Sequence, residues 1–259
     1  MGHTRTDWSE YYTGGRDFRR LGEEEKSLLV EQAPAPKDGR ALDVGCGTGE
    51  LAVHLASLGY TVDGVDFAEG ALERARAEHP EAERVRWLCV DVEHDDLSGL
   101  AEDGYDLVVL RLSIAFVRDR ARVLRRLAAR LREGGTLVVI TPVVEHTPRE
   151  RRRIALDERE LGALTDGFEQ VERFDTQNLA VLVLRGPVGS FSAEKRLRPE
   201  PQAVFGAAVV VTDASGRVLL GRSARGMREL PAAAGSPPSS ATVVSAPPVT
   251  CPPVDSAGS

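Results

Sequence analysis

The sequence predicts an α/β fold: a doubly wound, mostly parallel seven-stranded sheet. Three observations predict it. Short apolar runs alternate with helical patterns from residue 41 to residue 185, a glycine-rich turn joins the first run to the first helix, and a tight connection joins the last two runs. Alternating strands and helices form right-handed crossovers, which make neighbouring strands parallel. The tight connection predicts that the last two strands pair antiparallel.

The first βαβ unit contains the strand "ALDVG" at 41–45, a helix within "ELAVHLASLG" at 50–59 and the strand "VDGVDF" at 62–67. The three leucines of the helical segment share one face, and its last residue is a glycine, which is typical of a helix end. The sequence therefore predicts that the glycine turn lies between a buried strand and the start of a helix.

Further elements follow in the same alternation, and we expect them in this order: a helix at 68–79, strands at 85–92 and 105–112, an arginine-rich helix at 119–132 and a strand at 135–143. The arginine-rich helix is expected to cover the sheet with an apolar face and to expose its arginines. That face would contain Ala121, Leu124, Ala128 and Leu131. Asp157 is a predicted helix N-cap, with Glu160 three residues on, and closing strands are expected at 168–175 and 179–186.

Composition limits the classes of function. A chain of 259 residues with 42% hydrophobic and 28% charged residues can bury a core, and a net charge of -7 gives no general attraction to nucleic acid or to anionic membranes. No apolar stretch has the length of a bilayer span, and the N-terminus lacks the apolar core of a signal peptide, so we expect a cytoplasmic protein. Cys46, Cys89 and Cys251 form no CxxC pair, which predicts reduced thiols and no metal site.

The chemistry concentrates in "LDVGCGTGE" at 42–50. Gly45, Gly47 and Gly49 would let the backbone approach a small polar ligand and direct free amides toward it. A dinucleotide fingerprint would need its third glycine where this chain has Glu50, which disfavours a dehydrogenase. Cys46 is expected to be a small residue that fits between the glycines, because no base that would activate a nucleophile is adjacent to it.

Two aspartates follow predicted strands at the same edge of the sheet. Asp66 ends the second strand, so its carboxylate is expected to face the ligand crevice and suits two hydroxyl donors. Alternatively, Asp66 only caps the next helix. Asp91 ends "WLCVD", where the alternative is an aspartate that forms a turn.

The segment "ALDVGCGTGELAVHLASLGYTVDGVDFAEGALERARA" resembles motif I and the following acidic motif of class I S-adenosylmethionine (SAM)-dependent methyltransferases. The resemblance implies a Rossmann-like methyltransferase fold with SAM as cofactor. It implies that the glycine turn passes under the methionine part of SAM, that Asp66 binds the ribose hydroxyls and that Asp91 contacts the adenine amine. The remaining cofactor-binding positions implied in this way are Asp43, Phe67, Val92 and the backbone near Arg111. For the Arg111 side chain, a surface position is the alternative.

The expected activity is methyl transfer to a small-molecule acceptor of unidentified chemistry. Two alternatives stay open: a SAM-binding regulatory or interaction module without turnover, and a bifunctional methyltransferase and Nudix hydrolase ancestor that has lost its Nudix activity. Methyl transfer from a sulfonium depends mainly on alignment, with a base only for acceptors that lose a proton. Weak candidates for such a base are His146, His94 and Tyr12, and for both histidines the alternative is a solvated side chain without a role.

Residues 1–40 are expected to form a helical lid over the SAM-binding domain at 41–187. Trp8, Tyr11 and Tyr12 lie together ahead of a predicted helix that ends at Pro34. The alternative is that these aromatic side chains are core beneath that helix. The basic segment "PRERRR", which begins at Pro148, follows the fifth strand and could attract an acidic acceptor.

The C-terminal part divides into a linker at 188–202, a hairpin fragment at 203–231 and a low-complexity tail at 232–259. "AVFGAAVVVTDASGRVLLGRSARGMREL" resembles the start of a Nudix hydrolase domain, but no RExxEE pattern follows Pro231. That pattern would supply the carboxylates that hold the divalent cation. We therefore expect no nucleoside diphosphate hydrolysis and a disordered tail, with a frameshift in an ancestral fusion gene as its hypothetical origin. The alternative origin is an ordinary disordered tail.

Overall fold

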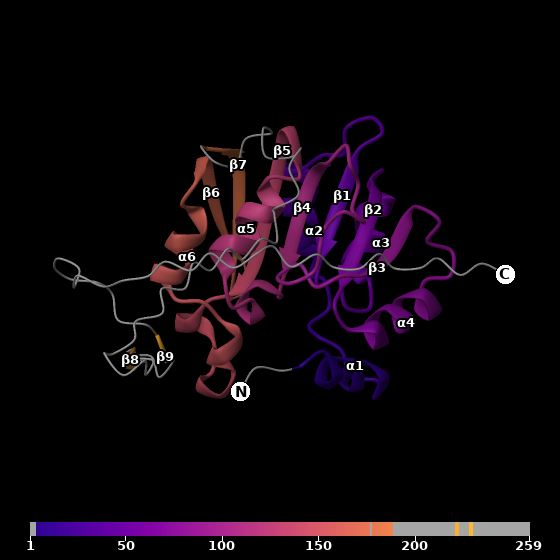
Figure 1. The fold of residues 1–259 in the computed structure, drawn as a ribbon. Helices are drawn as coiled ribbons and strands as arrows, with labels where there is room; N and C mark the ends of the chain where they lie inside the picture. The colour runs from indigo at the N-terminus through magenta and orange to yellow at the C-terminus, as the bar shows by residue number, and fades with distance from the viewer. Residues whose placement is uncertain (1–3, 177, 189–220, 223–227, 230–259) are drawn as a thin grey trace, which may run out of the picture. The chain divides into compact units, whose positions relative to one another are not determined.

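The computed structural model describes residues 4–176, 178–188, 221–222 and 228–229. The chain divides into two units, Met1–Pro199 and Glu200–Ser259. The first unit contains a seven-stranded sheet with helices on both faces (Figure 1). Its strands are β1 (Arg40–Val44), β2 (Thr61–Asp66), β3 (Val85–Cys89), β4 (Tyr105–Arg111), β5 (Leu131–Pro142), β6 (Phe168–Thr176) and β7 (Leu179–Pro187).

The strand order is β3-β2-β1-β4-β5-β7-β6. All pairs from β3 to β5 are parallel, whereas β7 runs antiparallel to both β5 and β6. The predicted fold class, a doubly wound and mostly parallel sheet that ends in an antiparallel pair, is confirmed. The order reverses at β1, and ligands of doubly wound sheets bind in the crevice at such a point.

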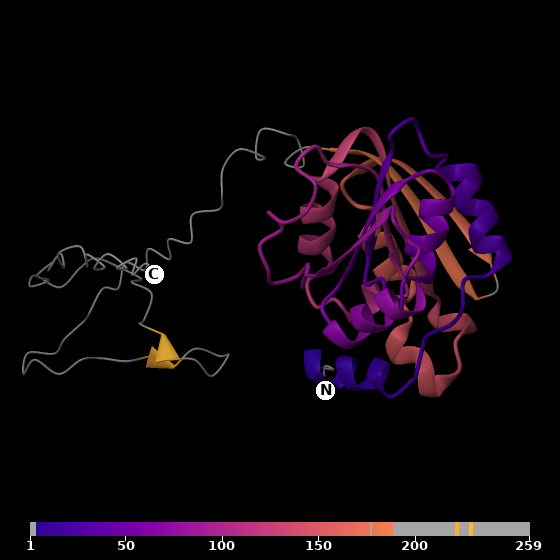
Figure 2. The same ribbon diagram turned by 90° about the vertical axis from the view of Figure 1, so that its right-hand side faces the viewer.

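The helices are α1 (Arg5–Thr13), α2 (Glu23–Gln32), α3 (Glu50–Ser57), α4 (Glu69–Glu78), α5 (Arg120–Ala128) and α6 (Glu158–Thr165). Helices cover both faces of the sheet, while α1 lies beyond the end of the sheet beside α4 (Figure 2). Side chains of α2 and α3 share one buried cluster with Leu107 and Val109 of β4, while α5 and α6 share another with Val108 and Leu110. Because successive residues of β4 face opposite layers, residues 107–110 are all apolar and do not alternate with polar ones.

The arginine-rich helix is shorter than its pattern predicts. α5 ends at Ala128, and Leu131 already belongs to β5, where it pairs with Tyr105 of β4. Ala121, which was expected on the apolar face, is exposed, because Val123 and Leu127 occupy the buried face of α5 together with the predicted Leu124 and Ala128. The prediction of a helix to residue 132 was therefore wrong at its C-terminal end.

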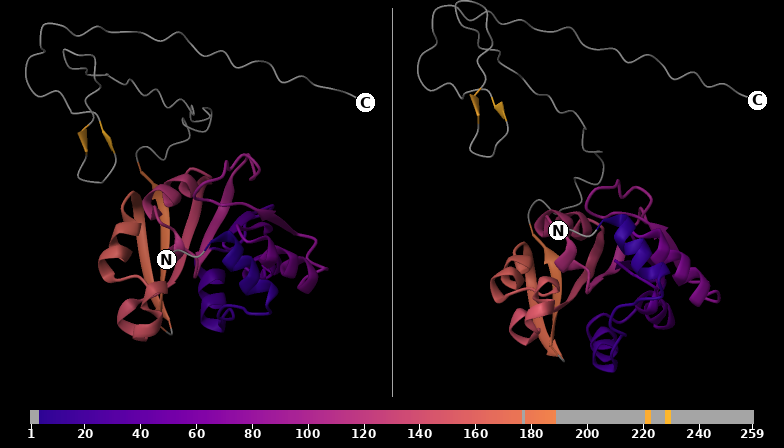
Figure 3. Two further views of the ribbon diagram at one scale, coloured as in Figure 1. Left: turned by 60° about the horizontal axis from the view of Figure 1, so that its bottom comes forward. Right: turned by 90° about the horizontal axis from the view of Figure 1, so that it is seen from below.

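The N-terminal part contains two helices where the sequence predicted one. The predicted aromatic side chains lie within α1 itself, whose first turn is closed by a capping box between Thr4 and Asp7. α1 packs beside α4 (Figure 3). The Arg74 guanidinium of α4 holds the end of α1 by donating to the carbonyl oxygens of Tyr12, at 3.2 Å, and Arg16, at 2.8 Å.

The predicted N-cap of α6 is confirmed. The Asp157 carboxylate accepts from the Glu160 amide at 2.7 Å, and the Glu160 carboxylate accepts from the Asp157 amide at 3.0 Å. After β5 the chain also forms two short 3-10 turns, η2 (Val144–His146) and η3 (Arg149–Ile154), and another, η1 (Ile114–Phe116), follows β4. Within the described residues, no helix combines the length and the apolar character that crossing a membrane requires.

The second unit contributes one short antiparallel pair to the described residues, β8 (Gly221–Arg222) with β9 (Arg228–Glu229). The predicted linker apart from Val188, most of the predicted hairpin fragment and the whole predicted tail lie outside the described residues. The predictions for these segments, including the resemblance to a Nudix domain, stay predictions.

Candidate functional site

A cavity of about 360 Å³ lies at the carboxyl ends of β1, β2, β3 and β4. Its size falls within the roughly 300–1,000 Å³ of small-molecule sites. The glycine turn after β1 forms one wall, and residues of α1 and of the segment after α1 form part of the wall facing it. The sequence predicted a ligand crevice at this edge of the sheet, and the cavity is formed there.

The glycine turn has a conformation that only glycine adopts without strain. Gly45, Gly47 and Gly49 have φ angles of 72°, 55° and 89°. A Cβ atom at Gly45 would lie 2.6 Å from the Cβ of Ser113, and one at Gly49 would lie 2.3 Å from the Trp87 ring. The backbone amides of Gly45 and Cys46 both donate to the Val65 carbonyl, at 2.8 Å and 3.0 Å, which ties the turn to β2.

Asp66 connects this turn to the start of α4. Its Oδ2 accepts from the Gly47 amide at 3.0 Å and its Oδ1 accepts from the Ala68 amide at 2.9 Å. The second bond resembles the helix-capping alternative, yet the same carboxylate also lines the cavity. Burial raises the pKa of Asp66, and the hydrogen bonds from Ala68 and Gly47 oppose that rise.

Asp43 carries a buried oxygen with no partner. Its side chain is 1% exposed, and among the described residues no donor reaches Oδ2. Burial raises the pKa of this carboxyl to about 7, although the charge of Arg111 lowers it. An unpartnered buried carboxylate oxygen is costly, so a cationic or donor group of a ligand in the adjoining cavity would stabilise it.

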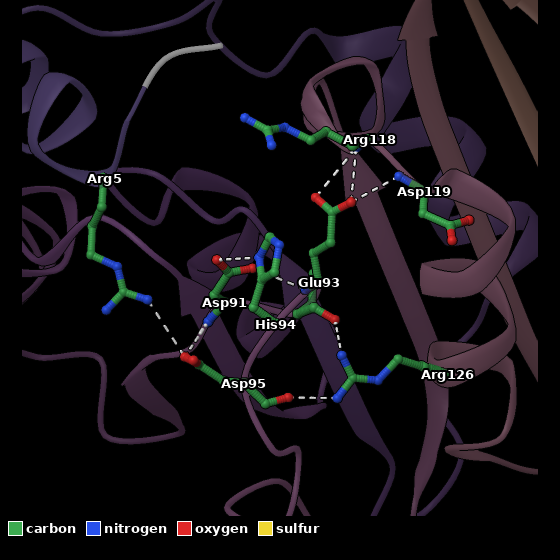
Figure 4. Close-up of polar contacts among 9 residues, drawn as sticks. Arg5, Asp91, Glu93, His94, Asp95, Arg118, Asp119 and Arg126 are labelled. Carbon is green, nitrogen blue, oxygen red and sulfur yellow. Dashed lines mark hydrogen bonds and ion pairs between the residues drawn. The ribbon is translucent and has the colours of Figure 1, made fainter. Parts of the chain in front are cut away.

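Asp91 forms a turn, as the alternative interpretation proposed. Its Oδ1 accepts from the Glu93 amide at 2.9 Å, and its Oδ2 lies 3.0 Å from His94 Nδ1 (Figure 4). The Asp91 amide in turn donates to Asp95 at 2.9 Å. Asp91 and Val92 still line the cavity, as does Phe67 after β2.

The Arg111 side chain lies inside the molecule, so the alternative of a surface position was wrong. It is 10% exposed, and its Nε donates to Oε1 of Glu25 in α2 at 2.8 Å. Its terminal nitrogens donate to the carbonyl oxygens of Arg19 and Arg20, at 3.0 Å and 2.9 Å. The guanidinium therefore holds the N-terminal segment against the end of β4. Reasoning from sequence missed Glu25, because a run of three glutamates gives no sign of which one is buried.

Tyr12 of α1 packs on the glycine turn. Its hydroxyl lies 3.0 Å from the place that a Cβ of Gly47 would take, and the residue is 7% exposed. Burial, with Asp66 nearby, raises the Tyr12 pKa far above its ordinary value, so the phenol stays protonated and can act only as a hydrogen-bond donor or acceptor. A raised pKa does not suit a general base near neutral pH.

Two further bonds close the N-terminal segment over the turn. The Thr48 hydroxyl donates to Asp17 at 2.9 Å, and the Leu21 amide donates to Glu50 at 2.9 Å. Of the predicted aromatic group, Trp8 and Tyr12 line the cavity, while the Tyr11 hydroxyl donates to the Asp17 carbonyl outside it.

Of the two histidine candidates, the structure places only one at the cavity. His94 lines the cavity, whereas His146 is exposed on η2 and is not part of the cavity wall. Cys46 is buried, and burial raises the pKa of its thiol well above the ordinary value, which does not suit a nucleophile. No group of three or more metal-ligating side chains occurs in the part of the chain that the structure describes.

The sheet order and the glycine turn belong to a Rossmann-like methyltransferase fold, which this chain shares with solved methyltransferase structures. Residues 42–137 match a family model described as a methyltransferase domain. That segment runs from β1 into β5 and contains the glycine turn, Asp66 and Asp91.

Individual methyltransferases are also similar to this chain in sequence. Methyltransferase GfsG of Streptomyces halstedii is 34% identical over 131 residues, 49% of this chain and 46% of that protein. The ubiquinone biosynthesis O-methyltransferase of Coxiella burnetii is 32% identical over 114 residues, 43% of this chain and 47% of that protein. This chain thus spans about half the length of these curated relatives.

Among solved structures, the N-methyltransferase NodS of Bradyrhizobium japonicum in complex with S-adenosylhomocysteine superposes with a TM-score of 0.54. It is 21% identical, and the alignment covers 64% of this chain and 87% of that one. At this level of identity, the likeness establishes the fold.

Proposed function

We propose that this chain is a SAM-dependent methyltransferase that acts on a small-molecule acceptor. The observation that carries the proposal is the unpartnered Asp43 Oδ2, buried at the cavity beside the glycine turn. A carboxylate in that position suits the ammonium group of an amino acid moiety. The match of residues 42–137 to a methyltransferase domain and the SAH complex of a protein with the same fold support this choice of ligand.

The residues of the cavity fit SAM. Asp66 would accept from the ribose hydroxyls while its bonds to two amides keep it in place. Phe67 and Val92 offer apolar contacts for the adenine, and the glycine turn leaves room for the methionine part, because no side chain projects from it at three positions. The Tyr12 hydroxyl is available as a donor on the lid side.

When bound, SAM supplies a methyl group on a positively charged sulfonium. The protein residues have to align the acceptor and exclude water, which together account for a large part of the acceleration in such reactions. α1 and the following segment, held by Arg74, Arg111 and Thr48, would act as the lid that excludes water. In this proposal residues 1–40 are the lid, residues 41–187 bind the cofactor and the reaction takes place in the cytoplasm.

The first test is cofactor binding. Calorimetry should show that the wild-type protein binds SAM and SAH, and that Asp66→Asn weakens both by about tenfold to a thousandfold, because hydrogen bonds to a charged group contribute about 1.5–3 kcal/mol each. Asp103→Asn is the matched control, since Asp103 is exposed before β4 and does not line the cavity. A wild type that binds SAM no better than Asp66→Asn would overturn the proposal.

The second test is turnover. Release of SAH in the presence of a panel of small hydroxyl, amine and carboxylate compounds would identify the acceptor class. SAM binding without SAH release for any acceptor would instead support the alternative of a regulatory module.

A further inference from the structure

The charged side chains that line the cavity differ in whether other groups of the protein already bind them. Asp66 and Asp91 bind backbone amides, and Glu50 and Asp17 are bonded to the N-terminal segment or the glycine turn. Among the arginines, Arg111 is fully engaged by Glu25 and two carbonyl oxygens. The carboxylates of this cavity therefore serve mainly to hold its walls in place.

Arg118 is different. It lines the cavity, yet throughout the described ranges no hydrogen bond or ion pair involves its guanidinium. Arg5, which also lines the cavity, lies 3.5 Å from a carboxylate oxygen of Asp95. Arg118 thus offers the cavity a planar, bidentate donor that no group of the described protein occupies.

The backbone of Arg118 is held by hydrogen bonds, although its guanidinium is not. The Glu93 carboxylate accepts from the amides of Arg118 and Asp119, at 3.1 Å and 2.8 Å, and Asp119 caps α5 by accepting from the Arg122 amide at 3.0 Å. Figure 4 shows the Arg118 guanidinium extending away from Asp119 and from the Glu93 carboxylate. A fixed backbone lowers the entropy that a ligand-binding side chain loses.

An aromatic wall lies next to Arg118. Phe116, two residues earlier, packs edge to face on Trp8 at 5.1 Å between ring centroids, and Phe18 lies 5.5 Å from Trp8 and 6.1 Å from Phe116. All three rings line the cavity and are only partly buried by the protein. Such a wall suits the face of a planar, apolar molecule.

Positive charge also gathers beside this wall. η3 contains four exposed arginines, Arg149, Arg151, Arg152 and Arg153, and it packs against η1, the turn that contains Phe116. A local basic segment on a protein whose net charge is -7 favours the approach of an anion at this place.

We propose that the methyl acceptor is an anion, a molecule with a planar apolar body and a carboxylate or phosphate group, and that Arg118 binds this group while Trp8, Phe18 and Phe116 hold the body. The inference rests on the proposed methyltransferase function. It adds the substrate class and the residue that selects it.

Four small aromatic probes test the inference by calorimetry on the SAH-saturated protein: benzoate, phenyl phosphate, benzyl alcohol and benzylamine. The two anions should bind at least about tenfold more tightly than the neutral and cationic probes, and Arg118→Gln should remove that preference, because a charge-assisted bond is lost. Arg122→Gln is the matched control: Arg122 lies four residues on, is exposed and does not line the cavity. The control should keep the preference.

Each outcome decides the inference. Equal binding of all four probes, no binding of either anion, or a preference that survives Arg118→Gln would overturn it, and the last result would assign the anion to the arginines of η3. Comparison of benzoate with phenyl phosphate distinguishes the two anionic groups. SAH binding is measured first, so a failure of the methyltransferase proposal is seen separately, and the probes can then still be compared on the free protein.

Discussion

One wall of the cavity, from Asp43 to Phe67, comes from two neighbouring strands and the turns that follow them, whereas the wall opposite combines α1, residues 17–19 and the segment around η1. The first wall is held by backbone amides that donate to Asp66 and to the Val65 carbonyl. The second is held by side chains that join distant segments, above all Arg111 with Glu25. After the proposed function, we name the first the cofactor wall and the second the acceptor wall. The difference teaches that the cofactor wall is built mainly from neighbouring segments, while the acceptor wall depends on a few long-range ion pairs and hydrogen bonds.

The largest expected effect is a loss of stability when the ion pair between Arg111 and Glu25 is broken. Arg111→Met leaves Glu25, 1% exposed, without its cation, and removal of one partner from a buried pair costs about 3–5 kcal/mol. Arg76→Met removes an ion pair with Glu69 whose side chains are 45% and 49% exposed, so its cost should stay below about 1 kcal/mol. Urea unfolding measures both. Equal losses for the two variants would contradict the importance of the Arg111 attachment.

The second prediction concerns the local wall. Gly49→Ala should lower the free energy of unfolding by about 2–4 kcal/mol, because it combines a left-handed backbone with a Cβ that would lie 2.3 Å from the Trp87 ring. Gly134→Ala separates the two causes: its φ is 74°, but nothing lies within 4 Å of the added Cβ. This control should lose only about 1–2 kcal/mol. If the two variants were equally destabilised, the Trp87 contact would have no role.

The contrast between the walls also explains what the sequence could predict. Gly45, Gly47, Gly49 and Asp66 lie close together in the chain, and their backbone requirements leave a readable spacing. The sheet was predictable for a related reason: β4, β5 and β7 contain buried apolar runs, and the connecting helices have one apolar face.

The acceptor wall was only partly predictable. The sequence indicated Trp8 and Tyr12 as a lid, but the partners Phe116 and Phe18 come from segments whose approach depends on tertiary packing. Arg118 gave no signal, because one arginine near an arginine-rich helix has the pattern of a solvated surface. Arg111 was assigned through its backbone, while its side chain serves a buried pair that no local pattern reveals.

A third prediction uses the pH dependence of SAM binding. In the free protein burial raises the pKa of Asp43 to about 7. Its ionised form is the one that would attract the ammonium group, so affinity for SAM should rise as the pH increases toward about 7 and level off above it. Below that value the affinity should fall by up to about tenfold per pH unit, because each protonated carboxyl must first lose its proton.

Calorimetry between about pH 5.5 and 7.5 measures this dependence, a range that stays below the usual pKa of an α-amino group. Asp43→Asn should bind SAM more weakly near neutral pH and with little change across the same range. A wild-type affinity that is constant with pH would contradict the assignment of Asp43 to the ammonium group.

The smallest expected effect is that of replacing His146, and it is compared with the effect of replacing His94, which lines the cavity. His146 is exposed on η2 and does not line the cavity, so His146→Gln should change kcat/KM by about twofold or less, as is usual for surface substitutions. His94 lines the cavity and bonds Asp91 at 3.0 Å, so His94→Gln should have the larger effect of the two on SAM or acceptor binding. Initial rates with the identified acceptor, measured with each variant at several pH values, provide the comparison. A tenfold loss in His146→Gln, with a changed pH profile, would show that η2 reaches the reacting groups. The acceptor wall would then extend beyond α1 and η1 to the end of β5.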